Sequence, residues 1–142
     1  MNNLKKLSEL THTLQRVESN LHEEKTVLEF ILEQTTDGYF DWNIVTGYEY
    51  LSPKFKFQLG YLPEEMDNTP EAWQAICNKE DLDKAFITIT SHLQGETESF
   101  TETLRFTHKQ GHEITILCKG KVVSRDENGT PLRMIGTHTI IS

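Results

Sequence analysis

Residues 1–34 contain neither glycine nor proline, and leucine recurs at every seventh position from 7 to 28. Further apolar residues follow these leucines by three positions, which produces the alternating a and d spacing of a coiled coil. This repeat constrains the segment to a long helix whose apolar stripe needs a partner. We therefore expect an N-terminal coiled-coil helix that forms a homodimer. The dimer seam would consist of Leu7, Leu10, Leu14, Val17, Leu21, Leu28 and Ile31.

One residue interrupts the repeat, because Glu24 occupies a d position. A buried carboxylate there would weaken the pair or fix its register. The same apolar stripe also fits an amphipathic helix that lies on its own domain, and the sequence leaves both arrangements open. The composition changes after this helix, so we expect an N-terminal helix over residues 1–34 and a separate domain over residues 35–142.

Charge and apolar runs exclude several classes of protein. The chain has 14 basic and 22 acidic residues and a formal net charge of −8, which disfavours nucleic acid and anionic membrane surfaces as partners. No apolar run approaches the roughly 20 residues needed to span a bilayer, and the N-terminus lacks the apolar core of a signal peptide. The two cysteines, Cys77 and Cys118, are too few for a disulfide framework. We expect a cytoplasmic chain without membrane insertion.

Strand patterns occupy both ends of residues 35–142. Phe40, Trp42 and Ile44 alternate with polar residues, Thr46-Gly47 marks a turn, and residues 48–51 would return as the second strand of a hairpin. Three more strands are expected over residues 100–106, 114–122 and 132–141, with turns at 109–112 and 126–131.

Helix signals lie between these two groups of strands. Ser52-Pro53 and Thr69-Pro70 each place an N-cap residue before a proline at the first helical position. Gly60 would end the first of these helices. In the second, the apolar residues on one helical face are Trp73, Ile76 and Cys77.

A longer helix is expected between Asn78, its N-cap, and Gly95, which ends it. His92 lies near its C-terminal end, where an exposed histidine would complement the helix dipole. The apolar stripe of this helix consists of Leu82, Ala85, Phe86, Ile89 and Leu93.

The order of these elements predicts the fold class. Strands and helices are segregated along the chain, which indicates an α+β fold with a five-stranded antiparallel sheet. Such a sheet buries one face, so we expect the short helices to cover that face and to enclose a cavity against it. The long N-terminal helix precedes this domain.

Sequence patterns of enzymes and metal sites are sparse. There is no glycine-rich phosphate loop and no GxSxG elbow, and the six histidines lack the spacing of a zinc site. His108 and His112 flank a hairpin turn, where solvated polar residues are expected. A small α+β enzyme would need a buried, paired carboxylate in the cavity, for which the strand candidates are Asp41 and Glu102. We expect no catalytic residue and no metal.

Five segments carry a resemblance to a known family. They are DGYFDWNIVTG at 37–47, LSPKFKFQLGY at 51–61, EAWQAICNKEDL at 71–82, LRFTHKQG at 104–111 and GKVVSRDENGTPLRMIGTHTIIS at 120–142. In this order they resemble the PAS domains, with a trailing PAC segment, of bacterial sensor histidine kinases and diguanylate cyclases. The resemblance covers roughly residues 28–142. It implies a noncatalytic sensor domain that passes a signal to a C-terminal output domain, a kinase or a cyclase, absent from this chain.

The sequence departs from the family pattern at several positions. Asn78-Lys79 replaces a His-Pro pair, Gln110 replaces the aspartate of a KDG turn, and Ile140-Ile141-Ser142 replaces a terminal Asp-Ile-Thr. In the family that last triplet joins the sensor to the helix leading into the output domain, so the usual signal-transfer contact is altered. Because the chain stops there, we expect a fragment of a longer protein, with a free-standing module as the alternative.

The resemblance also bears on the cofactor, whose identity the sequence leaves unknown. Flavin-binding photosensors of this fold carry a reactive cysteine in an NCRFLQ-like helix, which is missing here. Heme-binding relatives use a histidine on the long helix, where His92 lies too close to the C-terminal end. Both cofactors are therefore disfavoured, and a small organic ligand or no ligand remains.

The leading hypothesis is a regulatory domain in which a ligand repacks the helices against the sheet and changes the pose of two protomers. A ligand-free dimerisation and interaction module with a solid core is the alternative, and a small enzyme is a remote one. Every candidate pocket residue is also explained as core. The candidates are Phe40, Trp42, Phe55, Leu59, Trp73, Phe86, Ile89, Phe100, Leu104, Ile116 and Met134.

Overall fold

A computed structural model describes residues 2–142, which divide into two compact units: the residues up to Thr35 and Thr36–Ser142. The division falls one residue after the boundary expected from the sequence. The first unit is one helix, α1 (Asn3–Thr35). None of its described residues is buried, and the seven a and d residues of the expected seam are 48% to 65% exposed. Among residues 2–142, no helix has both the length and the apolar character to cross a bilayer.

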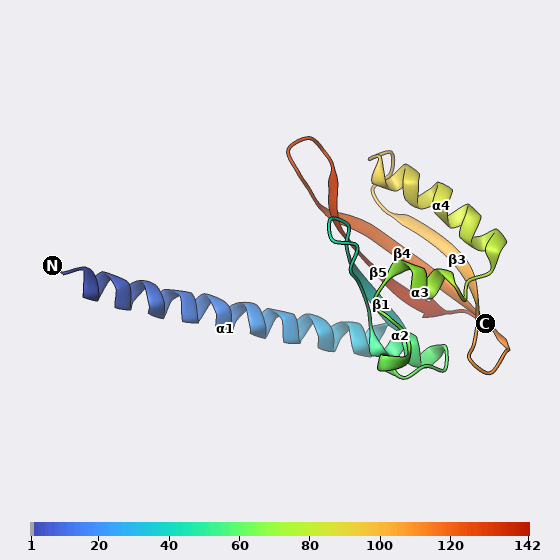
Figure 1. Ribbon diagram of the computed structural model, residues 1–142, viewed down its shortest axis with the longest axis horizontal. Coiled ribbons are helices and arrows are strands. Elements are labelled where there is room, and N and C mark those ends of the chain that lie inside the picture. The colour runs from blue at the N-terminus through green and yellow to red at the C-terminus, as the bar shows by residue number, and fades with distance from the viewer. Residues whose placement is uncertain (1) are drawn as a thin grey trace. The chain divides into compact units, whose positions relative to one another are not determined.

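The second unit is built on a five-stranded antiparallel sheet with the strand order β2-β1-β5-β4-β3 (Figure 1). The first hairpin and the three later strands lie where the sequence predicts them. The α+β fold with a five-stranded sheet is therefore confirmed. The strands are β1 (Gly38–Asn43), β2 (Glu49–Leu51), β3 (Phe100–Thr107), β4 (Glu113–Arg125) and β5 (Pro131–Ile140).

Short helices cover one face of this sheet, here called the inner face (Figure 1). Their starts follow the predicted capping. The Ser52 side chain accepts a hydrogen bond from the backbone N–H of Phe55, and Thr69 and Asn78 cap the next two helices in the same way. The helical elements are α2 (Pro53–Gln58), the 3₁₀ turn η1 (Pro63–Glu65), α3 (Pro70–Gln74) and α4 (Lys79–Leu93).

The end of α3 differs from the prediction. The helix stops at Gln74, and Cys77 forms a β-bridge with Phe106 on β3 instead of continuing a helical face. The backbone N–H of Asn78 donates to the carbonyl of Arg105 (2.7 Å). The edge strand offers unpaired backbone groups, and residues 76–78 satisfy them, which the local helix pattern does not reveal.

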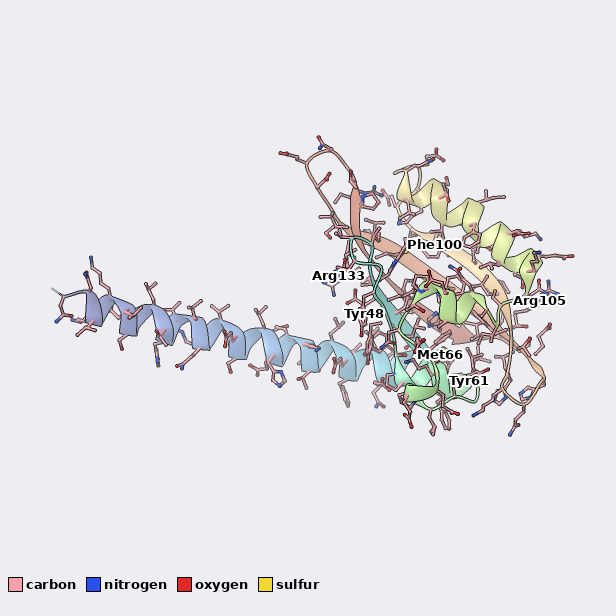
Figure 2. The ribbon with its side chains drawn as sticks, in the orientation of Figure 1. Tyr48, Tyr61, Met66, Phe100, Arg105 and Arg133 are labelled. Atoms are coloured by element: carbon pink, nitrogen blue, oxygen red, sulfur yellow. The ribbon has the colours of Figure 1, made fainter. Side chains whose placement is uncertain are left out.

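Arg105 on β3, labelled in Figure 2, joins the start of α4 to the same strand through Asp81. Asp81 accepts hydrogen bonds from the backbone N–H of Arg105 (2.8 Å), from its Nε (2.8 Å) and from its Nη2 (2.9 Å). A two-pronged pair of this kind is both charge-assisted and geometrically specific. It ties the first turn of α4 to β3.

The C-terminal end of α4 corrects the expectation for His92. The imidazole is buried rather than exposed: its Nε2 accepts from the backbone N–H of Val122 (2.9 Å), and its Nδ1 lies 3.0 Å from the carbonyl of Thr97. The cation at this helix end is Arg125, which donates to the carbonyls of His92 and Leu93. Periodicity places His92 on α4 but does not show that β4 covers it.

Candidate functional site

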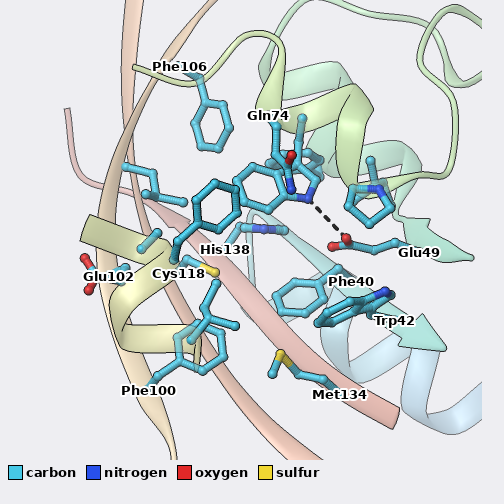
Figure 3. A pocket seen from close by; sticks show the side chains of 18 of the residues that line it. Phe40, Trp42, Glu49, Gln74, Phe100, Glu102, Phe106, Cys118, Met134 and His138 are labelled. Carbon is cyan, nitrogen blue, oxygen red and sulfur yellow. Dashed lines mark hydrogen bonds between the residues drawn. The ribbon is translucent and has the colours of Figure 1, made fainter. Parts of the chain in front are cut away.

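A cavity of about 170 Å³ lies between the inner face of the sheet and helices α3 and α4 (Figure 3). Aromatic and aliphatic side chains make up most of its wall. All five strands contribute to it, since their inner-face residues alternate with outward-facing ones. An apolar hollow with a few polar groups is the usual form of a small-molecule site.

Two glycines explain how the floor of the cavity is formed. Gly120 on β4 and Gly136 on β5 are paired in register at the centre of the sheet. The ring of Phe100 lies over Gly120, where a Cβ atom would come within 2.5 Å of the ring, and the ring of Phe40 lies over Gly136 in the same way. Because the glycines lack side chains, both rings lie low on the sheet and leave space above them.

The structure brings most of the sequence-predicted pocket residues to this wall. Leu59 and Ile116 are exceptions, because both are buried in the core but do not line the cavity. Leu59 ends α2, and the sequence pattern identifies it as buried without showing which part of the core it fills. The candidates that line the cavity are Phe40, Trp42, Phe55, Trp73, Phe86, Ile89, Phe100, Leu104 and Met134.

Glu49 is one of the cavity residues that the sequence reasoning missed. It lies on β2 opposite Trp42 of β1, on the inner face, and is 6% exposed. Its Oε1 accepts a hydrogen bond from Nε1 of Trp73 on α3 (3.1 Å), drawn in Figure 3. Burial raises the pKa of the Glu49 carboxyl to about 7, against the lowering effect of the Trp73 hydrogen bond. The sequence does contain a signal for this placement. Along a strand Glu49 and Leu51 point to one face and Tyr50 to the other, so Glu49 shares the face of the apolar Leu51.

His138 is the second ionisable group of the wall. It is 5% exposed, stacks on the ring of Phe55 with 4.1 Å between the centroids, and its Nδ1 has no hydrogen-bond partner among the described residues. Burial lowers the pKa of His138 to about 3, so the imidazole is neutral at physiological pH. A neutral imidazole offers one donor and one acceptor.

Two further polar groups of the wall are less available for chemistry. Burial raises the pKa of the Cys118 thiol to about 12, so it is not a thiolate nucleophile. Glu102 accepts a hydrogen bond from the hydroxyl of Thr88 on α4. The Cys77 thiol, outside the cavity, also has a pKa raised to about 12 by burial.

The remaining sequence candidates lie away from the cavity. Asp41 faces the opposite side of the sheet, where it pairs with Arg133. His108 and His112 stack on each other beside the β3–β4 turn, and no group of three potential metal ligands occurs within residues 2–142. Within residues 2–142, the Glu49 side chain has one hydrogen-bond partner, Trp73. Glu49 therefore does not form a carboxylate pair in the cavity.

The volume of the cavity limits the size of a guest. An apolar protein cavity of roughly 150 Å³ holds one benzene molecule. The cavity here therefore fits a single ring or a compact aliphatic group with a short substituent. Heme and flavin are several times larger than this volume, and both ring nitrogens of His92 have partners within the chain.

Comparisons with known proteins agree with this architecture. Residues 48–138 match the family model described as PAS fold. No curated protein sequence matches the chain significantly.

Several solved structures share the fold at low sequence identity. A sensory box histidine kinase/response regulator from Burkholderia thailandensis is 24% identical, with a TM-score of 0.67 over 80% of this chain and 83% of that one. The N-terminal domain of a diguanylate cyclase with PAS/PAC sensor from Marinobacter aquaeolei is 23% identical (TM-score 0.63; 74% and 94%). A domain of a histidine kinase from Haloarcula marismortui, described as light and redox sensing, is 17% identical (TM-score 0.63; 83% and 99%).

Proposed function

The chain belongs to the PAS fold family, and from this premise we propose that it is the regulatory sensor module of a signalling protein. In this proposal residues 36–142 bind a small molecule in the cavity, α1 pairs with a second copy, and the occupied state is passed to an output domain of the histidine kinase or diguanylate cyclase type. The module itself does not catalyse a reaction.

The observation that carries the proposal is the cavity inside an otherwise closely packed domain. Protein cores are normally filled to the density of organic crystals, and a void of this size costs stability unless something occupies it. A module that acted only by dimerisation would gain from a filled core. The cavity therefore supports ligand binding over a solid interaction module.

A short hydrogen-bonded junction supports a route for the signal. The backbone N–H of Asp37 donates to the carbonyl of His138 (2.9 Å), and the Asp37 carboxylate accepts from the backbone N–H of Ile140 (2.7 Å). The end of β5 is thus tied to the residues that directly follow α1 in the chain. Because His138 also lines the cavity, a ligand that moves its ring acts on a residue of this junction.

The first experiment is an absorption spectrum of the purified 142-residue chain, followed by mass spectrometry of what denaturation releases. Release of a compact organic molecule in stoichiometric amount is the expected result. A Soret or flavin band would contradict the compact-ligand proposal, because both cofactors are several times larger than the cavity. A clean spectrum with nothing released would favour the ligand-free dimerisation module.

Dimerisation through α1 is tested separately by light scattering. The double variant Leu14→Asp/Leu21→Asp places two charges in the apolar stripe and should convert the dimer into a monomer. Ser8→Asp/Gln15→Asp adds the same charges to the same helix outside the seam and should remain a dimer. A double seam variant that stays dimeric would exclude the coiled coil.

A further inference from the structure

Among the described residues, three polar groups of the cavity wall are incompletely paired: the Glu49 carboxyl, Nε1 of Trp42 and Nδ1 of His138. Glu49 is a buried carboxyl with a single hydrogen bond, from Trp73, and none of the four ion pairs among the described residues includes it. A buried carboxyl group is costly without a partner that stabilises its charge. Core packing alone would be better served by an apolar residue at this position.

The surroundings of Glu49 have the character of a cation site. Trp42 is the register partner of Glu49 on β1, and Trp73 donates its indole N–H to the carboxyl, so a tryptophan from each side of the cavity lies beside the group. Aromatic faces attract ammonium groups, and indole does so most strongly. A carboxylate between aromatic rings therefore combines a charged partner with rings that favour a cation.

The other ionisable groups of the wall do not oppose a cation. His138 is neutral because burial holds its pKa near 3, and the Cys118 thiol keeps its proton because its pKa is about 12. The Glu102 carboxylate already accepts a hydrogen bond from the hydroxyl of Thr88. No lysine or arginine lines the cavity, so a positive charge meets no like charge in the wall, whereas an anionic ligand would meet Glu49 without compensation.

We infer that the cavity binds a compact organic cation, a small primary amine carrying one ring or a short aliphatic group, with its ammonium paired to Glu49 between Trp42 and Trp73. The apolar part of the molecule then lies towards Phe100, which Figure 3 shows at the lower left of the cavity, away from Glu49 at the right. The volume of about 170 Å³ sets the limit of one ring with a short arm. This inference rests on the proposed ligand-sensing function and names the ligand class.

Binding is accompanied by release of the proton from the Glu49 carboxyl. The Glu49 carboxyl, with a pKa of about 7, must be ionised to pair with an ammonium group, so affinity rises between pH 6 and pH 8 while the amine stays protonated. The ionisable groups around this carboxyl are Glu71 of α3, Cys118 of β4, and the two others of the cavity wall, Glu102 of β3 and His138 of β5. The pKa values of Cys118 and His138 lie outside this pH range, and Glu71 is an exposed residue outside the cavity.

Three probes of nearly equal size separate the possible ligand classes: benzylamine, benzyl alcohol and benzoate. Their affinities for the full 142-residue chain are measured by calorimetry at pH 7.5, with chemical-shift changes of the cavity residues locating the site. Benzylamine should bind at least about tenfold more tightly than benzyl alcohol, since a charge-assisted hydrogen bond replaces a neutral one. Benzoate should bind most weakly, and only the amine should bind more tightly at pH 8 than at pH 6.

Variants assign the preference to Glu49. In Glu49→Gln the affinity for benzylamine should fall to that for benzyl alcohol and lose its pH dependence, while Glu49→Asp should keep part of the preference. The matched control is Asp41→Asn, which removes the same charge from the opposite face of the sheet and should leave the preference intact. Melting curves of all variants show whether each one is folded.

The outcomes separate this inference from the proposed function. If benzyl alcohol or benzoate binds in the cavity as tightly as benzylamine, or if Glu49→Gln keeps the full preference, the cation assignment is wrong while a small-ligand sensor stands. If none of the three probes shifts the cavity residues, the cation assignment is wrong, and the ligand-sensing function is decided separately by whether denaturation releases a bound molecule.

Discussion

Two carboxyl groups of the PAS domain are buried to nearly the same degree, in regions with opposite electrostatics. At the junction of α4 and β3, Asp81 is 9% exposed and is held by the backbone and the guanidinium of Arg105, which keep the pKa of this carboxyl below its usual range. In the cavity wall, Glu49 is 6% exposed and has one indole partner, and desolvation raises its pKa to about 7. A small exposed fraction therefore does not by itself decide the charge of a carboxyl group; the depth of its burial and its partners do.

The difference separates a structural group from a candidate functional one. The Asp81 cluster is satisfied within the chain, so its carboxylate is stable as an ion and orients α4. The carboxyl of Glu49 retains capacity for a further partner inside a cavity, which is the arrangement that marks binding sites.

The largest effect is expected from Asp81→Ala. It removes the acceptor of three hydrogen bonds from Arg105 and should lower the Tm by roughly 5–15 °C. Because the folded-state pKa of Asp81 lies below its ordinary value of 3.8, its stabilisation is present above pH 4 and is lost as the pH falls. Thermal melts should therefore show a smaller difference in Tm between the variant and the unaltered chain at pH 3 than at pH 7. Asp83→Ala, an exposed neighbour on α4, is the control, and an equal loss there would exclude a specific role for the Arg105 pair.

Glu49→Gln is expected to stabilise the domain, whereas Asp81→Ala destabilises it. The folded-state pKa of about 7 lies above the ordinary value of 4.5, so the folded chain binds the extra proton and loses stability as the pH rises from about 4.5 to 7. Glutamine retains an acceptor for Trp73 without the charge. The variant should therefore gain about 1–3 kcal/mol in free energy of unfolding at pH 8 and nothing at pH 4. Urea titrations at both pH values measure this, and a destabilised variant at pH 8 would show that the Glu49 ion is stabilised by its surroundings.

Filling the cavity tests whether the void beside Glu49 is the ligand site. Ala85 on α4 is fully buried and lines the cavity, and leucine at this position favours a helix and adds apolar volume to the void. Ala85→Leu should raise the Tm by roughly 2–5 °C and abolish binding of benzylamine. Scanning calorimetry and titration measure the two effects on the same sample. Unchanged binding would show that the ligand lies elsewhere.

The smallest effect is expected at Asp41, whose pair with Arg133 has the same two-pronged geometry as the Asp81 pair. The two side chains are 34% and 55% exposed, so water and salt screen their attraction. Asp41→Asn should cost less than about 1 kcal/mol in free energy of unfolding, and the cost should vanish in 1 M salt. A loss comparable to that of Asp81→Ala would mean that geometry, rather than burial, determines the contribution of such pairs.

Local patterns determined most of the secondary structure. Alternating residues fixed the strands around Phe40 and Ile116, and the cap residues Ser52, Thr69 and Asn78 fixed the helix starts, because period and capping are encoded within a few neighbouring residues. The heptad of leucines predicted α1, whose pairing stays a prediction. The apolar cavity residues were also predictable as a group, since the inner face of an amphipathic sheet follows from alternation.

Tertiary contacts decided the chemistry of the site and the places where the structure differs from the local sequence pattern. His92 is buried because β4 covers it, and Cys77 leaves the helical face because β3 offers an open edge. A residue's own neighbours in the chain fix its backbone and the face it occupies. Its desolvation and its partners come from elements distant in the sequence, and these set its charge and its availability to a ligand.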